Sequence, residues 1–182
     1  MSRIYERVAL IGLGLIGGSF ALAAKRAGLV GEVVGHARTR RTRETALSLG
    51  LVDRAEATAA AAVEGADLVL FCTPVGAMGR VAAEIAPALA PGATVSDVGS
   101  VKGAVIAAVG PHLPEGVHFV PGHPLAGTEH SGPEAAFPEL YENRWYILTP
   151  PEGADPEAVA RLRAAWEGCG ASVDLMDADH HD

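Results

Sequence analysis

The chain has 182 residues, of which 49% are hydrophobic and 20% are charged. That length suits one well-filled domain and is too short for two large ones. The formal net charge of −8 disfavours nucleic acid and anionic membrane surfaces as partners, and no apolar stretch is long enough to span a membrane. The two cysteines lack metal-ligand spacing, so we expect no metal site, and without an apolar leader we expect a cytoplasmic protein.

Short runs rich in valine, isoleucine and leucine alternate along the chain with longer alanine-rich stretches. The short runs predict strands at Val8–Ile11, Glu32–His36, Leu68–Cys72, Thr94–Asp97, Phe119–Pro121, Trp145–Leu148 and Ser172–Leu175. The longer stretches predict helices at Leu15–Ala27, Arg41–Leu49, Ala55–Val63, Val75–Leu89, Val101–Val109 and Pro156–Glu167. This alternation predicts one α/β domain over residues 1–182, with a doubly wound, mostly parallel sheet. Ligands of such sheets bind at the carboxyl ends of the strands.

The first predicted strand runs directly into a Gly-x-Gly-x-x-Gly turn and then into a helix. Gly12 permits the tight turn, Gly14 lets a pyrophosphate approach the backbone, and Gly17 lets the helix pack closely on the strand. The helix starts at Leu15 and Ile16, where free N–H groups would face the phosphates. The order of strand, turn and helix therefore predicts a Rossmann-type dinucleotide site. A glycine-rich turn without a ligand is the alternative.

The segment after the second predicted strand bears on the choice of cofactor. An acidic residue usually stands here when the ribose 2′-hydroxyl of NAD is recognised, and none is present. Instead, Arg38, Arg40 and Arg41 surround Thr39. Guanidinium groups suit a 2′-phosphate through charge and paired hydrogen bonds, so this pattern favours NADP. NAD remains the alternative if these arginines are only the solvated start of a helix.

Further candidates follow the later strands. Thr73 and Pro74 are expected to lie along the dinucleotide, although a plain turn would explain them equally well. Ser100 precedes a predicted helix, where serine is most often only a cap. Lys102 is a possible anion contact but is more simply explained as a surface charge. Among seven histidines, His123 stands out as a candidate acid or base, because it lies between Gly and Pro after what we expect to be a central strand.

Taken together and in this order, three segments resemble the prephenate/arogenate dehydrogenase family: Ile11–Ser19, Asp97–Gly103 and Pro121–Gly127. The stretches Thr128–Gly132 and Trp145–Pro150 are similar to that family as well. The resemblance covers the whole chain but only the amino-terminal half of the family's usual length. It implies that a C-terminal helical domain, which provides dimerisation and part of the substrate pocket, is absent from this chain. We therefore expect the full-length form to be a homodimer.

The resemblance implies NAD(P)-dependent oxidative decarboxylation of prephenate, arogenate or both, in tyrosine biosynthesis. His123 would take the proton of the substrate's ring hydroxyl, and Ser100 would orient that hydroxyl and the nicotinamide beside it. Thr128 and Lys102 are weaker candidates for contact with the substrate. Two alternatives stay open: a cofactor-binding module that does not turn over in this shortened form, and a dehydrogenase of the β-hydroxyacid type.

Overall fold

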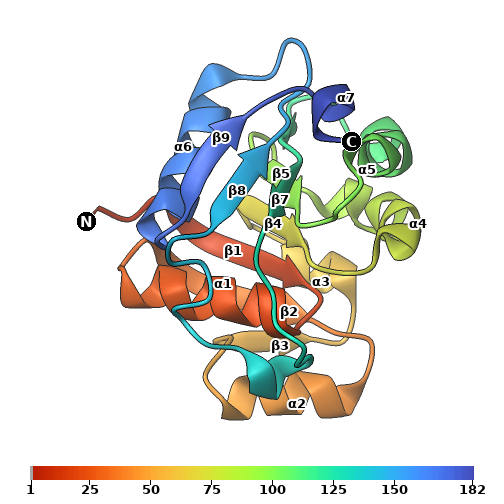
Figure 1. Cartoon of the computed structure of the whole chain (residues 1–182). Coiled ribbons are helices and arrows are strands. Elements are labelled where there is room, and N and C mark those ends of the chain that lie inside the picture. The colour runs from red at the N-terminus through yellow and green to blue at the C-terminus, as the bar shows by residue number, and fades with distance from the viewer. Residues whose placement is uncertain (1) are drawn as a thin grey trace.

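The computed structural model describes residues 2–182, and strands and helices alternate along most of the chain (Figure 1). The strands are β1 (Tyr5–Ile11), β2 (Val30–His36), β3 (Arg54–Glu56), β4 (Leu68–Phe71), β5 (Thr94–Asp97), β6 (His118–Phe119), β7 (Gly122–Pro124), β8 (Trp145–Leu148) and β9 (Ser172–Leu175). The α-helices are α1 (Leu15–Arg26), α2 (Arg40–Ser48), α3 (Ala59–Val63), α4 (Val75–Ile85), α5 (Lys102–Val109), α6 (Pro156–Gly168) and α7 (Ala178–His181). Short 3-10 helices occupy Ala86–Ala88, Gly110–His112 and Pro133–Ala135.

The main sheet has six parallel strands in the order β3-β2-β1-β4-β5-β6. This confirms the doubly wound α/β fold, and the order is that of dinucleotide-binding Rossmann domains. Both faces are buried: Val8 and Leu10 pack on the side of α1, whereas Ala9 and Ile11 pack against α3, α4 and α5. Burial on both faces explains why the strand sequences are continuously apolar. The strand order reverses between β1 and β4, which is where this fold places its ligand.

A second sheet of three strands, β7-β8-β9, packs beside the first, with β7 antiparallel to β8 and β8 parallel to β9 (Figure 1). The sequence predicted a single strand at Phe119–Pro121, and this prediction is wrong. The main sheet ends with β6 at Phe119, and β7 begins at Gly122. Pro121 has no N–H to continue a ladder, so the chain leaves the first sheet there. His123 consequently lies on the short β7, and the neighbouring β6 is an edge strand rather than a central one.

Two predicted helices also differ from those observed. The stretch Ala55–Val63 divides into the edge strand β3 and the short helix α3, whose first turn is capped by the Thr58 hydroxyl. The stretch Val75–Leu89 ends as an α-helix at Ile85 and continues as a 3-10 turn that contains a proline. No helix in the described part of the chain is long and apolar enough to cross a membrane.

Candidate active site

The carboxyl ends of four central strands meet at one edge of the main sheet. Ile11 on β1 pairs with His36 on β2 and with Phe71 on β4, and Phe71 pairs in turn with Asp97 on β5. The glycine turn, the arginine segment, Thr73 and Ser100 each follow one of these strands. The structure therefore brings the segments that the sequence singled out to the same side of the molecule.

The three glycines of the turn are present for different reasons. Gly12 has φ +107°, and a Cβ there would lie 2.7 Å from the Cys72 carbonyl oxygen. A Cβ at Gly17 would lie 3.0 Å from the Cys72 Sγ, so α1 packs against this turn through a glycine. A Cβ at Gly14 would meet nothing within 4 Å. Protein packing therefore requires Gly12 and Gly17, whereas Gly14 leaves open space beside the backbone.

The start of α1 faces this open space. Gly14 caps the helix without a side-chain hydrogen bond, and the first turn carries no acidic residue. The N–H groups that begin at Leu15 and Ile16 are thus not satisfied by a side-chain cap, which is the arrangement that binds phosphate at helix starts.

A pocket of about 530 Å³ adjoins the glycine turn. It is lined by Gly12, His36, Arg38, Thr73, Pro74 and Arg80, among others. The hydroxyl oxygen of Thr73 is buried and has no hydrogen-bond partner among the described residues, so it is free to bond a ligand. This orphaned hydroxyl and the space beside Gly14 both fit a bound dinucleotide. Arg80 was not among the predicted site residues, because it lies on α4 rather than directly after a strand.

The arginine segment divides into different roles. Arg38 lines the pocket and has no carboxylate partner among the described residues. Thr39 caps α2 with its hydroxyl. Arg40 pairs with Glu44 at 2.9 Å on the exposed face of that helix, and Arg41 is exposed. Of the four predicted contacts, Arg38 is therefore the one placed to meet a phosphate in the pocket.

Ser100 lies in the loop between β5 and α5, and its exposed hydroxyl makes no hydrogen bond to any residue from 2 to 182. The interpretation of Ser100 as a helix cap is wrong, because Val101 occupies the cap position. The first N–H groups of α5, at Lys102 and Gly103, bond the Asp182 carboxylate at 2.9 and 2.8 Å. The Ser100 hydroxyl is consequently available to a ligand.

Lys102 is not a surface charge, which corrects the sequence interpretation. Its side chain is fully buried, and its ammonium donates to the Asp97 carboxylate and to the carbonyl oxygen of Gly122. Asp97 also accepts a hydrogen bond from the Gly122 N–H at 3.1 Å. The ion pair therefore binds both backbone groups of Gly122, its N–H through Asp97 and its carbonyl oxygen through Lys102. Burial raises the pKa of Asp97 and lowers the pKa of Lys102, while their mutual attraction opposes both shifts. The pair holds β7 against the end of β5, and the Lys102 side chain is buried there rather than exposed to a substrate.

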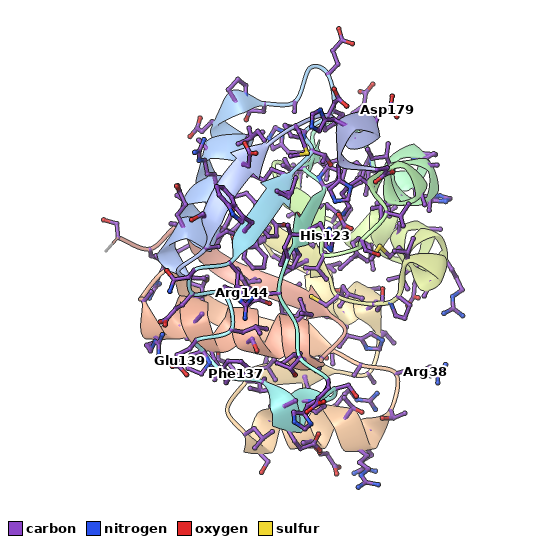
Figure 2. The ribbon with its side chains drawn as sticks, in the orientation of Figure 1. Arg38, His123, Phe137, Glu139, Arg144 and Asp179 are labelled. Carbon is purple, nitrogen blue, oxygen red and sulfur yellow. The ribbon has the colours of Figure 1, made fainter. Side chains whose placement is uncertain are left out.

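His123 follows Gly122 directly, and its imidazole is partly buried (Figure 2). Its Nδ1 lies 3.0 Å from Nε2 of His181, whereas its own Nε2 has no hydrogen-bond partner in the described chain. Burial, together with the neighbouring His181 and Lys102, lowers the pKa of His123 to about 4. The ring is therefore neutral near pH 7 and able to accept a proton. Figure 2 shows Arg38 well apart from His123, as the two ends of a dinucleotide site require.

The remaining candidates are less directly placed. Thr128 lies in an exposed loop, and its hydroxyl accepts the His130 N–H at 3.1 Å. His181 and Asp182 were not predicted as site residues, since nothing in their spacing links them to residues far earlier in the chain. Within residues 2–182, no three histidine, cysteine or acidic side chains cluster as metal ligands.

Comparison with known proteins agrees with this geometry. A family model described as "Prephenate dehydrogenase, nucleotide-binding domain" matches residues 20–175. The cyclohexadienyl dehydrogenase of Zymomonas mobilis is 43% identical over 179 residues, which cover 98% of this chain and 61% of that protein.

Solved structures give the same result. The structure of A. aeolicus prephenate dehydrogenase in complex with hydroxyphenyl propionate and NAD+ matches with a TM-score of 0.89 at 32% identity, over 97% of this chain and 61% of that one. Synechocystis arogenate dehydrogenase matches with a TM-score of 0.88 at 34% identity, over 96% of this chain and 61% of that one. The chain thus spans about three-fifths of the length of these relatives.

Proposed function

Since the chain belongs to the prephenate dehydrogenase family and matches its nucleotide-binding domain, we propose that it is the cofactor-binding part of an enzyme that oxidatively decarboxylates prephenate, arogenate or both. One observation carries this proposal. The imidazole of His123 is neutral, and its Nε2 is free to accept a proton. The preceding residue, Gly122, is hydrogen-bonded to Asp97 at the end of β5, so His123 lies at the sheet edge that also bears the glycine turn. A base beside a dinucleotide site is the arrangement that oxidation of an alcohol needs.

The chain's own residues account for a bound nicotinamide dinucleotide. The N–H groups at the start of α1, beside Gly14, would hold the pyrophosphate, and the Thr73 hydroxyl would bond the part of the cofactor in the pocket. Arg38 would meet a ribose 2′-phosphate, which favours NADP over NAD. When bound, the nicotinamide supplies the hydride acceptor.

His123 would act on the ring hydroxyl of the substrate. Its Nε2 accepts the hydroxyl proton, and the increased electron density on that oxygen favours oxidation of the carbon that bears it. Ser100, whose hydroxyl is unengaged, would hydrogen-bond the same substrate oxygen and fix its position beside the imidazole. Thr128 is proposed as a weaker contact from the exposed loop that follows β7.

The relatives act on different but related substrates, and this chain spans only part of their length. We place the groups that distinguish prephenate from arogenate, and the contacts of a homodimer, in the portion of the family that this chain does not span. An enzyme of amino-acid biosynthesis with these small, charged substrates is proposed to act in the cytoplasm.

The test is a comparison of His123→Asn with the unmodified enzyme, in the longest form that the gene encodes. Turnover of prephenate and of arogenate is measured with NAD and with NADP. We expect kcat to fall by about 10²-fold or more while the Kd of the cofactor stays nearly constant. His112→Asn is the matched control, because that residue is exposed and lies outside the loop that carries Thr128. Near-normal turnover by His123→Asn would remove the histidine from the mechanism. Cofactor binding without turnover of either substrate by the unmodified enzyme would favour a binding module instead.

A further inference from the structure

Three side chains form a continuous row behind the candidate base. His123 Nδ1 lies 3.0 Å from His181 Nε2, and His181 Nδ1 lies 2.7 Å from the Asp182 carboxylate. The two imidazole rings meet edge to face, with their centroids 5.2 Å apart at 73°. His181 and Asp182 belong to the end of the chain, where α7 lies beside α5 (Figure 1).

The row determines which ring nitrogens carry hydrogen. Backbone N–H groups of Gly103 and Lys102, with the imidazole of His181, lower the pKa of Asp182 to about 2, so its carboxylate is ionised and only accepts hydrogen bonds. His181 must therefore donate from Nδ1. In a neutral His181 the Nε2 is then bare and can only accept, so His123 must donate from its own Nδ1. The remaining nitrogen of His123, Nε2, is left with a lone pair.

The row is anchored at both ends to the same helix start. The Asp182 carboxylate accepts the N–H groups of Lys102 and Gly103 at 2.9 and 2.8 Å, in a first turn that has no side-chain cap of its own. The Lys102 ammonium, in the same turn, bonds the carbonyl oxygen of Gly122, next to His123. A closed ring of contacts thus runs from α5 through β7 to His123, and back through His181 and Asp182.

We propose that His181 and Asp182 are positioning residues, which hold His123 in the tautomer with hydrogen on Nδ1 and so direct its basic Nε2 toward the substrate. The inference rests on the proposed role of His123 as the base. The proton moves from the substrate hydroxyl to Nε2, and His123 becomes an imidazolium with hydrogen on both nitrogens. Its Nδ1–H bond to His181 then becomes charge-assisted, and the proton on Nε2 later returns to solvent. The same division of labour orients the histidine of a Ser-His-Asp triad.

Two substitutions of one residue separate this role from packing. The Gln side chain places an amide oxygen near the position of Nε2 in histidine, so His181→Gln keeps an acceptor for His123. The shorter Asn in His181→Asn does not reach that position. His180→Gln is the control, because His180 is exposed on the same helix and its side chain makes no hydrogen bond to the described residues.

The first readout does not depend on activity. Long-range ¹⁵N–¹H NMR of the 182-residue chain reports which nitrogen of His123 carries hydrogen. We expect hydrogen on Nδ1 in the unmodified chain, in His181→Gln and in the control, and a mixture of tautomers in His181→Asn. A predominant Nε2–H form in the unmodified chain, or no change in His181→Asn, would overturn the proposal.

The second readout is turnover of the longest form of the enzyme. We expect His181→Asn to lower kcat by about 10-fold or more with the KM of the cofactor unchanged, because part of the general-base contribution is lost. His181→Gln should recover kcat to within a few-fold. If kcat fell equally in His181→Asn and His181→Gln, the role of His181 would be structural, and the inference would be contradicted. If the enzyme oxidises neither substrate, the proposed function fails, and the NMR result still decides whether the row sets the tautomer.

Discussion

At the scale of single residues, the buried ion pair of Asp97 and Lys102 sets the position of the candidate base. A Lys102→Met substitution keeps most of the side-chain volume but leaves Asp97 buried without its partner. Removing one member of a buried pair typically costs 3–5 kcal/mol, so we expect the free energy of unfolding to fall by about 3 kcal/mol. Urea unfolding followed by circular dichroism measures the loss.

The double variant Asp97→Asn/Lys102→Met is the control for this prediction. A neutral amide at position 97 still accepts the Gly122 N–H but no longer places an unpaired charge in the interior. The double variant should therefore recover at least about 1 kcal/mol relative to Lys102→Met alone. The single variant Asp97→Asn is measured as well. If the loss in the double variant equalled the sum of the losses in Asp97→Asn and Lys102→Met, the two groups would not act as a pair.

A second prediction at this scale concerns the choice of cofactor. Arg38 lines the pocket, and Arg38→Ala should raise the Kd of NADP by about 10-fold or more, because a hydrogen bond to a charged group contributes roughly 1.5–3 kcal/mol. The Kd of NAD, which has no 2′-phosphate, should change less than about 3-fold. Calorimetric titration of each cofactor measures both values.

Arg40→Ala supplies the comparison, since Arg40 is engaged with Glu44 on the outer face of α2. This variant should bind both cofactors as the unmodified chain does. If Arg38→Ala weakened NAD and NADP equally, the arginine would contact a group common to both, and the preference for NADP would be refuted.

At the scale of elements, the turn between β1 and α1 separates folding from binding. Gly12→Ala places a Cβ 2.7 Å from the Cys72 carbonyl oxygen at a φ of +107°, so we expect a loss of about 2 kcal/mol or more in unfolding free energy. Gly14→Ala meets no protein atom within 4 Å and should change stability by less than about 1 kcal/mol. Its methyl group occupies the space left for a phosphate, so the Kd for the dinucleotide should rise by about 10-fold or more.

Urea unfolding and cofactor titration of the two variants test this division. A Gly14→Ala variant that is stable and binds normally would mean that the pyrophosphate does not approach the backbone there. A Gly12→Ala variant as stable as the unmodified chain would mean that the turn relaxes without strain.

Elements that depend on local pattern were predictable from the sequence. Strands β5, β8 and β9 have the predicted bounds, because continuous or alternating apolar runs between turns are a local signal. The short edge strand β3 and the break at Pro121 depend on which strand lies alongside, which the local sequence does not contain. The four-residue helix α7 lacks the length needed for a periodic pattern.

The same distinction applies to the candidate site. His123 and Ser100 were found by residue type and by place after a predicted strand. The contact of His123 with His181 joins residues 58 apart in sequence, and no spacing rule predicts it. The burial of Lys102 depends on the second sheet packing across the end of β5, so a residue that resembles the start of an exposed helix is an interior cation.

At the scale of the whole molecule, the second sheet and α6 bring the end of the chain back to the first sheet. Trp166 of α6 stacks on Tyr146 of β8 with ring centroids 4.0 Å apart and also contacts Phe20 of α1. From β9 the chain passes to α7, which packs beside α5 (Figure 1). The surroundings of His123 are thus completed only when both sheets are assembled, which couples protonation of this ring to folding.

That coupling predicts a pH dependence of stability. The pKa of His123 is about 4 in the folded chain and about 6.5 when unfolded. Below pH 6.5 the unfolded chain therefore binds a proton at His123 that the folded chain does not bind, so the contribution of His123 to the unfolding free energy should be constant above about pH 7 and fall toward pH 4. Partial exposure of the ring reduces the effect, and we expect a loss on the order of 1 kcal/mol between pH 7 and 4.5.

Urea unfolding of the unmodified chain and of His123→Asn, from pH 8 to 4.5, isolates this contribution as the difference between the two curves. The Asp182 carboxylate, whose pKa is about 2 in the folded chain, is present in both chains, so its own pH dependence cancels in the difference. The curve of His123→Asn should be flatter, with its stability approaching that of the unmodified chain as pH falls. Parallel curves would mean that the ring titrates alike in the folded and unfolded chain, and hence that the assembled sheets do not hold it neutral.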